Sequence, residues 1–551
     1  MTSQTKKGNS FVKQAGILAM AGIICRIIGL LYRSPLTGII GETGNGFYAP
    51  AYRIYQMILL ISSYSIPSAV SKVISQRLAV HQYKNAQRIF RCSLIYVMIV
   101  GGAASVFAFV FADLLSPGKA AMVLRMLAPT IFFSGLLGVL RGYFQATKTM
   151  VPTSISQIME QILNAVVSIG AAFLLMKIFA DTDDKTRAAW GAVGSALGTG
   201  IGVLTALAFM FLLYEMNKKV ILDRVKRDTT PNVLTDKQIF RIILSMVTPV
   251  ILSTFAYNAS ALINQTLYLQ VMEKYHGERL DDILIINGIY DTQAVGLSNI
   301  PIAIASAMAA AILPSIAGTF EKRKVKEVNG KIHTAIKTIM FIAIPAAVGM
   351  MVLARPIVWL LYPTTAKSSI DMGGALLAAL GLSIVFYSLS TLSNAILQAV
   401  GKATKPVTNA CIALAVQTAI AAVLLFVTDW GIYCLPIAVT VYSLMMCILN
   451  GITVKKVTGY RQEWVNTFLL PFWASVVMGV ITAGVYYGLM QVLEDGWMTN
   501  AVSIAAAVVL GMLVYFAAAL KFGAMKKNEL QAMPGGRTMV VLAQRMHLLK
   551  K

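Results

Sequence analysis

The sequence predicts an all-α polytopic membrane protein with about 14 transmembrane helices, in two six-helix lobes related by a pseudo-twofold repeat plus two extra C-terminal helices. Three observations predict this fold class. The chain of 551 residues is 57% hydrophobic and only 13% charged, whereas soluble proteins are about 25% charged. Apolar runs of about 20 residues recur from end to end, long enough to cross a hydrocarbon core. Basic residues are concentrated in alternate connections between these runs.

The apolar segments can be placed in order along the chain, because turns and clusters of charge separate them. Each is long enough to cross the bilayer as a helix. The expected spans are 11–33, 48–76, 89–115, 122–145, 151–177, 188–213, 239–271, 294–318, 332–361, 373–399, 406–428, 431–454, 465–490 and 498–522.

The charges of the connections predict the topology. Most of the 47 lysines and arginines fall in the N-terminal tail, in every second connection and in the C-terminal tail. Arg141 and Lys337 are counted among these loop residues. The alternate connections carry acidic groups such as Asp181, Asp183 and Asp495. The positive-inside rule therefore places both termini in the cytoplasm. The net charge of +24 follows from the basic loops, so no nucleic-acid partner is expected, and the chain is assigned to the cytoplasmic membrane.

A repeat divides the chain into two halves. The segment "LRGYFQATKTMVP" (140–152) resembles "SNAILQAVGKATKP" (393–406), and "LLSP" (114–117) matches "LLYP" (360–363). Six helices in each half make the repeats parallel, an arrangement found among transporters with a substrate path between the halves. The expected domains are an N-lobe (1–216), a basic connection (217–238), a C-lobe (239–456), spans 13 and 14 (457–523) and a basic tail (524–551).

The first span carries two arginines within an apolar run, "GIICRIIGLLYRSP" (22–35). Arg26 and Arg33 are seven residues apart and share one helix face with Gly22 and Gly29. An arginine at the bilayer centre costs roughly 2.5–3.5 kcal/mol on insertion scales. These two therefore predict a water-filled cavity that receives an anionic ligand.

Other spans carry polar residues that are candidates to line the same cavity. Span 2 holds Arg53 and Lys72, and Pro67 should kink its helix. Span 5 holds Glu160 on a polar face, and span 7 places Ser253, Tyr257 and Asn264 on one face with Asn258 beside them. The candidate substrate-binding residues are Arg26, Arg33, Arg53, Lys72, Glu160, Asn258 and Asn264.

Structural interpretations of the same residues remain open. Arg53 and Lys72 can extend to opposite interfaces of the membrane. Glu160 can pair with one arginine, in which case both are structural. The amides of span 7 can serve as hydrogen bonds between helices. Against this, a single intramembrane acid faces several cations in the N-terminal half.

The remaining motifs point to structure rather than chemistry. "GETGNG" (41–46) is expected to be a turn between spans 1 and 2, and "GSALGTGIG" (194–202) a close helix-packing face. The five cysteines form no C-x-x-C pair, so neither disulfides nor zinc are expected. Asp281 and Asp282 have no accompanying acidic cluster or histidine. We therefore expect no enzyme activity, no cofactor and no metal.

Three segments of the chain resemble a known family of membrane transporters. The segments "CRIIGLLYRSPLTGIIGETGNGFYAPAYRIY" (25–55), "IPSAVSKVISQRLAVHQYKNAQRIFR" (66–91) and "VPTSISQIMEQI" (151–162) resemble the MurJ/SpoVB-type polysaccharide-precursor flippases, in their Gram-positive branch. These belong to the superfamily of multidrug, oligosaccharidyl-lipid and polysaccharide exporters. The likeness covers essentially the whole chain. It implies a cationic cavity between the lobes and a lipid-tail groove near spans 13 and 14.

The resemblance also implies roles for single residues. Arg26, followed by glycine at +3, matches the first essential arginine of the family. The second family arginine commonly lies six residues further on, whereas Arg33 lies at +7. Family members with a sodium site use acidic residues in span 7 and after. Span 7 here has no acidic residue beyond Asp236 at its entrance, so no sodium site is expected.

The implied function is a flippase that moves lipid II, the undecaprenyl-pyrophosphate-linked peptidoglycan precursor, from the inner to the outer leaflet by alternating access. Its partners would be lipid II and membrane lipids. The transporter would be a monomeric unit, with the cell-wall synthesis machinery as a possible associate. Two alternatives stay open: a flippase for another lipid-linked oligosaccharide, and a cation-coupled multidrug exporter of the same superfamily. An exporter of cations needs intramembrane acids, whereas the N-terminal half of this chain is rich in arginine.

Overall fold

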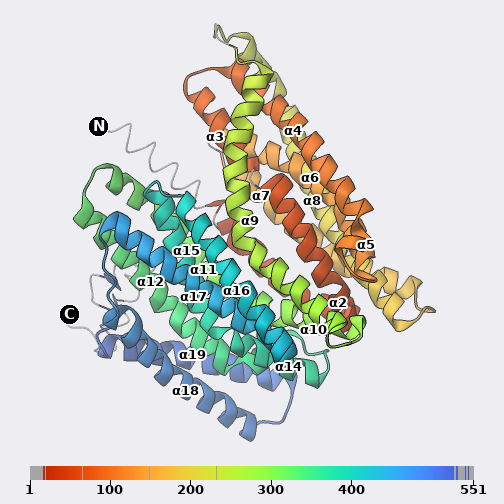
Figure 1. Cartoon of the computed structure of the whole chain (residues 1–551), viewed down its shortest axis with the longest axis vertical. Helices are drawn as coiled ribbons and strands as arrows, with labels where there is room; N and C mark the ends of the chain where they lie inside the picture. Colours follow the sequence, from red (N-terminus) through yellow and green to blue (C-terminus); the bar gives the residue numbers. More distant parts are fainter. Residues whose placement is uncertain are drawn as a thin grey trace. The chain divides into compact units, whose positions relative to one another are not determined.

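The computed structural model describes residues 17–18, 20–64, 66–147, 149–230, 233–525, 529–530, 540–541 and 544. These residues form helices and no strand (Figure 1). Eleven helical segments among them are long and apolar enough to cross a membrane, and shorter apolar helices such as Met20–Leu31 accompany them. The predicted all-α membrane fold is therefore confirmed, while the number fourteen stays a prediction. Residues 11–16 of expected span 1 lie outside the described residues.

The chain divides into two compact units. The first contains the described residues up to Gln265 together with Gly277–Gly288, and the second contains Thr266–His276 and the described residues from Ile289 onward. The long helix α9 (Asp236–Lys274) thus contributes to both. The predicted lobe boundaries stay predictions.

The first unit is a bundle of long helices that includes the first part of α9. Its other elements are Met20–Leu31, α2 (Arg33–Leu59), the π-helical turn η1 (Leu60–Tyr64), α3 (Ile66–Ala79), α4 (Tyr83–Val110), the short α5 (Ala112–Leu115), α6 (Ala120–Ala146), α7 (Val151–Ile178), α8 (Asp184–Lys226) and α10 (Leu280–Ile289). Helix α8 packs along α7 and α6, and α6 also packs against α3 and α4.

Helix α2 is broken at Gly41, where the backbone has φ 69° and ψ −175°. This positive φ favours glycine, because a side chain would be strained there. The amide of Asn45 donates to the hydroxyl of Thr37 across the break at 3.0 Å. The turn expected over 41–46 is therefore confined to Gly41, since the chain is helical again from Glu42.

Helices α7 and α8 are in close contact through small residues, as the "GSALGTGIG" motif predicted. A Cβ atom at Gly194 would lie 2.5 Å from the Ala172 nitrogen, and one at Gly202 would lie 2.6 Å from the Glu160 carbonyl oxygen. Such distances exclude any side chain at these glycines. This packing face fixes the position of the α7 backbone at Glu160.

The regular α-helix is interrupted just before Pro67, at the place where a kink is expected. Proline cannot donate to the carbonyl four residues earlier, here Ser63, and the π-helical turn η1 occupies that part of the chain. Glycines of α6 accommodate the proline, since a Cβ at Gly142 would lie 2.7 Å from the Pro67 carbonyl oxygen.

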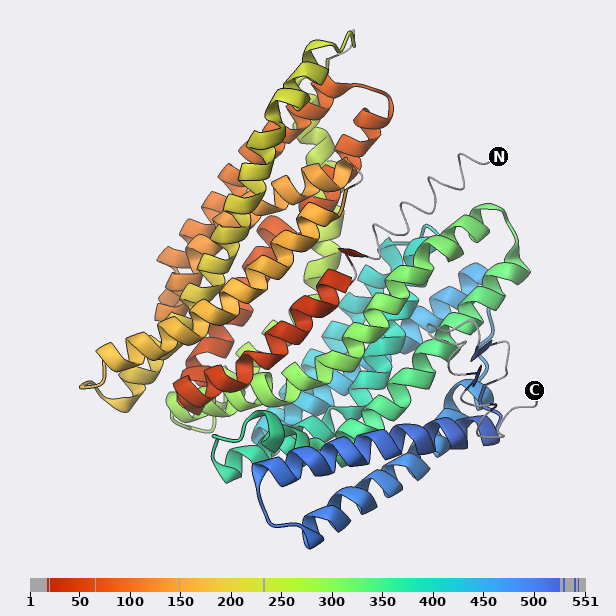
Figure 2. The same cartoon turned by 180° about the vertical axis from the view of Figure 1, so that it is seen from behind.

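The second unit is also a helix bundle, completed by the end of α9. Its other elements are η2 (Tyr290–Val295), α11 (Gly296–Glu321), α12 (Val325–Val352), α13 (Ala354–Leu361), α14 (Lys367–Ala379), α15 (Gly381–Ala399), α16 (Thr404–Val427), η3 (Gly431–Tyr433), α17 (Cys434–Thr458), η4 (Val465–Leu469), α18 (Leu470–Val492) and α19 (Trp497–Lys521). Helices α18 and α19 lie side by side (Figure 2), with α18 packed on α12 and α19 on α13.

The two units share local features at the matching "LLSP" and "LLYP" segments. In each, a long helix is followed by a short one, α4 by α5 and α12 by α13. These short helices end in the matching "LLSP" and "LLYP" segments. An arginine–aspartate pair lies next to each short helix, Arg125 with Asp113 and Arg355 with Asp371.

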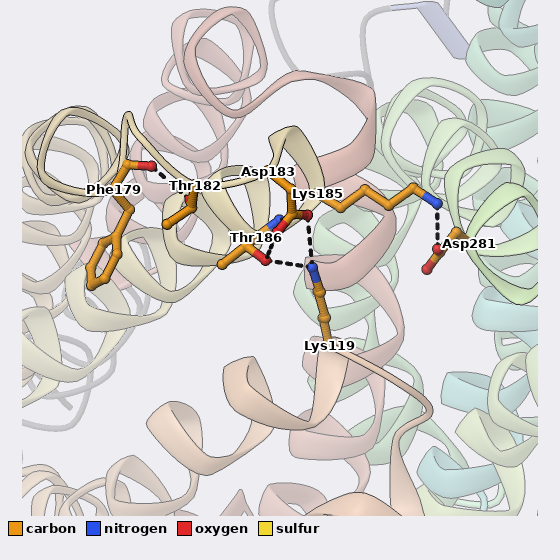
Figure 3. A network of polar contacts seen from close by, with 7 residues as sticks. All are labelled: Lys119, Phe179, Thr182, Asp183, Lys185, Thr186 and Asp281. Atoms are coloured by element: carbon orange, nitrogen blue, oxygen red, sulfur yellow. Dashed lines mark hydrogen bonds and ion pairs between the residues drawn. The ribbon is translucent and has the colours of Figure 1, made fainter.

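A polar network ties together one end of the first unit (Figure 3). Asp183 caps α8 by accepting from the Thr186 backbone nitrogen at 2.9 Å, and it also accepts from Lys119 at 3.2 Å. Lys185 binds Asp281 of α10 at 2.5 Å. The acidic loops that were expected outside the membrane therefore hold α6, α8 and α10 together.

Candidate functional site

Arg26 lies on the first apolar helix, Met20–Leu31, and its side chain is exposed. Large apolar neighbours on the same helix are exposed too, with Ile27 at 52% and Leu31 at 60%. Within the described part of the chain, no ion pair or side-chain hydrogen bond involves Arg26. The structure thus leaves this arginine accessible on an otherwise apolar helix.

Arg33 is the first residue of α2 and is half-buried. Backbone hydrogen bonds from Tyr32 to Ile28 and from Leu36 to Tyr32 continue the helical pattern between the two helices. Because the helical repeat is maintained, Arg26 and Arg33 keep the shared face that their spacing predicted.

A row of tyrosines on α2 lies near Arg33. The rings of Tyr48 and Tyr52 stack with centroids 5.2 Å apart, and those of Tyr52 and Tyr55 are 5.6 Å apart. The Arg33 guanidinium is close enough to the Tyr48 and Tyr52 hydroxyls to interact with them electrostatically. The break at Gly41 lies between Arg33 and these tyrosines in α2.

Glu160 forms an ion pair with Arg141. The Nη2 atom of Arg141 lies 2.7 Å from Glu160 Oε2, and the side chains are only 13% and 21% exposed. Arg141 Nε also donates to Ser156 Oγ at 2.9 Å. The pair therefore joins α6 to α7, as the structural interpretation of Glu160 requires, and its partner is an arginine that we had counted with the loops.

This pair lies close to the first helix. A Cβ at Gly29 would be 3.9 Å from Gln161 Oε1 of α7, and Cys25 lies within electrostatic range of both Glu160 and Arg141. Since Glu160 is already neutralised by Arg141, it does not serve as the counter-ion of Arg26 in this structure. Asp113 is likewise neutralised, because it forms an ion pair with Arg125.

The other candidate residues are dispersed within the first unit. Arg53 is half-buried on α2, whereas Lys72 is exposed on α3. On α9, the amide of Asn258 donates to the Thr254 carbonyl at 2.8 Å, and Asn264 is buried. The side chains of Ser253 and Tyr257 lie outside the described residues.

Sequence reasoning missed the role of Arg141. The signal that could have found it was Glu160 itself, because a carboxylate within a membrane-spanning helix needs a cation. Arg141 lies 19 positions before Glu160, on the preceding span, and both belong to the same half of the chain.

Asp236, the acid at the start of α9, is also occupied. It accepts a hydrogen bond from Arg88 at 2.6 Å. This hydrogen bond and the charge of Arg88 lower the pKa of Asp236. Among the described residues, no three His, Cys, Asp or Glu side chains are grouped in a way that could hold a metal ion.

Comparisons with known proteins agree with the resemblance seen in the sequence. The family model described as lipid II flippase MurJ matches residues 83–507. The chain is 25% identical to the lipid II flippase MurJ of Bacillus subtilis over 539 residues, covering 94% of this chain and 96% of the relative. It is 23% identical to stage V sporulation protein B of the same organism over 540 residues, covering 95% of this chain and 98% of the relative.

Solved structures show the same fold. A lipid II flippase MurJ in an inward closed conformation matches with a TM-score of 0.61 at 14% identity, covering 91% of this chain and 97% of the other. A multidrug resistance MATE family transporter of the MOP superfamily, in its inward-facing conformation, matches with a TM-score of 0.63 at 17% identity, covering 81% of this chain and all of the other. Because the family model spans well over half of the sequence, the chain belongs to the lipid II flippase MurJ family, a family of membrane transporters rather than enzymes.

Proposed function

We propose that this protein moves lipid II from the inner to the outer leaflet of the cytoplasmic membrane by alternating access. The pyrophosphate of the lipid would bind to Arg26 and Arg33, with Arg53, Lys72, Asn258 and Asn264 as further candidate contacts. A guanidinium suits this role, since its planar fork donates to two phosphate oxygens at once and stays protonated.

The observation that carries the proposal is the charge balance around Arg26. Glu160, the acid of α7, forms an ion pair with Arg141 at 2.7 Å. Its charge is therefore not available to compensate Arg26. A desolvated arginine is costly in a membrane. Water and an anionic headgroup would both lower this cost, and only the headgroup supplies a compensating charge.

The pairing of Glu160 with Arg141 bears on its role in the site. A carboxylate beside Arg26 and Arg33 could hold one of these arginines in the empty state and release it to the ligand. With Arg141 as its partner, Glu160 instead supports α7 beside the first helix. It remains in the candidate set as a residue that positions the site.

The charge balance also weighs against export of cationic drugs. A cation needs an available carboxylate, whereas Asp113 and Glu160 are each paired with an arginine. Another lipid-linked oligosaccharide with a pyrophosphate would satisfy the same arginines, so the identity of the saccharide is the finer part of the proposal.

Reconstitution in liposomes tests the function. Fluorescent lipid II would be incorporated with the purified protein, and the fraction exposed on each leaflet would be followed by chemical quenching of the label. We expect faster exchange of lipid II than in protein-free liposomes and no acceleration of an uncharged glycolipid with the same label. Equal acceleration of both lipids would contradict the proposal, as would folded protein that leaves lipid II exchange unchanged.

A further inference from the structure

A cavity of about 310 Å³ lies in the first unit. Neither Arg26 nor Arg33 lines it, and its residues belong to other helices. It is formed by the beginning of α4, the end of α6 and the last turns of α8. These are the segments whose basic loops predict the cytoplasmic side. A volume of about 300 Å³ is at the lower end of the range for small-molecule sites.

The wall of the cavity is amphipathic. Tyr143, Phe144 and Leu213 supply apolar surface, while Gln87, Asn217 and Arg224 supply polar groups. Such a wall suits a ligand that has both an apolar part and a charged, hydrogen-bonding part.

Gln87, in the wall of the cavity, carries a hydrogen-bond acceptor without a partner in the described part of the chain. Its side chain is only 6% exposed, and its Nε2 donates to the Tyr214 hydroxyl at 2.7 Å. Its Oε1 atom is buried with no hydrogen-bond partner among the described residues. A buried acceptor without a donor costs about 1–3 kcal/mol, so a ligand that donates here would be favoured.

Aromatic packing fixes Gln87 in this orientation. Phe90 packs against Tyr143 with ring centroids 4.8 Å apart and against Tyr214 at 5.0 Å. Because Tyr214 is held by this cluster, its hydroxyl stays within reach of the Gln87 amide nitrogen. The amide oxygen is left as an acceptor without a partner within the described ranges.

Arg224 supplies the charge. It lines the cavity and is exposed, and no described acid forms an ion pair with it. The nearby Asp228 is occupied, because its carboxylate accepts from the backbone nitrogens of Lys84 at 2.7 Å and Thr230 at 2.8 Å. The cavity therefore combines an available cation, a buried acceptor and an apolar wall.

We propose that this cavity binds a phosphate ester whose headgroup carries hydroxyl groups, with the phosphate on Arg224 and a hydroxyl donating to Gln87. An anionic phospholipid such as phosphatidylglycerol has this chemistry and an apolar part as well. A soluble sugar or glycerol phosphate has the same polar groups without the acyl chains. The site is separate from the proposed transport arginines.

The test compares two anionic lipids whose headgroups have the same three carbons and differ only in the hydroxyl groups. Full-length protein, purified in detergent and delipidated, would be titrated with phosphatidylglycerol or with phosphatidylpropanol of the same acyl chains, and binding measured by native mass spectrometry. We expect the wild-type protein to prefer phosphatidylglycerol about fivefold, the size of one hydrogen bond. Gln87→Leu should remove this preference.

Arg224→Gln should weaken the binding of both lipids about tenfold, since it removes a charged hydrogen bond. Arg227→Gln is the matched control, because Arg227 is an exposed arginine at the end of the same helix that does not line the cavity. It should bind like wild type. Arg224 is exposed, so its variant tests the proposal even if Gln87→Leu is poorly folded.

Two results would overturn the proposal: equal binding of the two lipids by wild-type protein, or the same loss of binding in Arg224→Gln and Arg227→Gln. Added glycerol 3-phosphate distinguishes the source of the ligand. Displacement of the lipid at millimolar concentration would assign the site to a soluble phosphate ester, whereas retention of the lipid would assign it to the membrane.

Discussion

Arg141 Nη2 lies 2.7 Å from Glu160 Oε2, and this ion pair joins α6 to α7 within the first unit. Both side chains are largely buried, so removing one partner leaves the other charge without compensation. The pair thus indicates a structural role for Arg141, in contrast to the ligand-binding role that we propose for Arg26.

Variants of this pair should show strong coupling. Arg141→Gln and Glu160→Gln should each lower the free energy of unfolding in detergent, and the double variant should recover part of the loss. We expect a coupling energy of about 1–3 kcal/mol from the double-mutant cycle. The exposed pair of Arg125 and Asp113 is the control, with an expected coupling below about 1 kcal/mol. Recovery of an Arg26→Ala variant by Glu160→Gln would show that Glu160 serves Arg26 instead.

Asp183 makes the end of the first unit sensitive to acid. Hydrogen bonds from the side chain and backbone of Thr186 and from Lys119 lower its pKa from 3.8 to about 2. A carboxyl whose pKa is lowered by folding stabilises the protein above its unfolded pKa, and this contribution is lost as the pH falls. The contribution should therefore be complete above about pH 4 and disappear between about pH 4 and pH 2.

The thermal stability of Asp183→Asn measures this effect. The variant should melt below wild type at pH 6, and the difference should shrink as the pH falls below about 4. Asp181→Asn is the control, since Asp181 is exposed in the same loop and forms no side-chain hydrogen bond or ion pair among the described residues. A difference that stayed constant down to pH 3 would show that the carboxylate charge is not involved.

The orientation of the chain in the membrane can be tested by cysteine labelling. In a variant without the five native cysteines, Asp495→Cys should react with an impermeant reagent from outside intact cells, and Lys456→Cys should not. The positive-inside rule predicts this result, because Lys455 and Lys456 belong to a basic connection. Labelling of position 456 from outside, with position 495 protected, would reverse the topology.

The sequence predicted the helices well because the signal for each is a long apolar run. The expected span 406–428 corresponds to α16 (Thr404–Val427), and 151–177 corresponds to α7 (Val151–Ile178). The close approach of α7 and α8 was also predictable, since glycines spaced by four residues have few other uses in a membrane helix.

What could not be predicted is where a helix continues beyond its apolar run. Arg141 and Lys337 were counted with the loops, but both lie within helices. Lys337 is 4% exposed and binds Glu529 of the C-terminal segment at 2.7 Å. These partners are distant in sequence or on another span, and hydropathy carries no information about such pairings.

The shared face of Arg26 and Arg33 could be predicted from the sequence, because helical periodicity alone determines it, whereas their role in binding stays a prediction. The surroundings of the site were not predicted. The tyrosine row of α2 lies within electrostatic range of Arg33, and the partner of Glu160 depends on how α6 packs against α7.

Membrane potential should drive the transport step. An anionic headgroup that moves outward in an inside-negative field gains about 2.3 kcal/mol per charge per 100 mV. Collapsing the potential with valinomycin and potassium should therefore slow lipid II exchange in energised proteoliposomes. Asp236 is engaged by Arg88, and we expect no slowing when sodium is replaced by choline at constant potential. Dependence on sodium alone would contradict this mechanism.

The central claim is that Arg26 binds the anionic headgroup. It is tested most directly by lipid II exchange in proteoliposomes that contain equal amounts of folded wild-type, Arg26→Ala and Arg26→Lys protein. We predict that Arg26→Ala loses exchange almost completely, that Arg26→Lys keeps part of it because the charge remains without the fork, and that both variants melt like wild type. Full exchange by folded Arg26→Ala would contradict the claim, and so would a loss of exchange that merely follows a loss of folded protein.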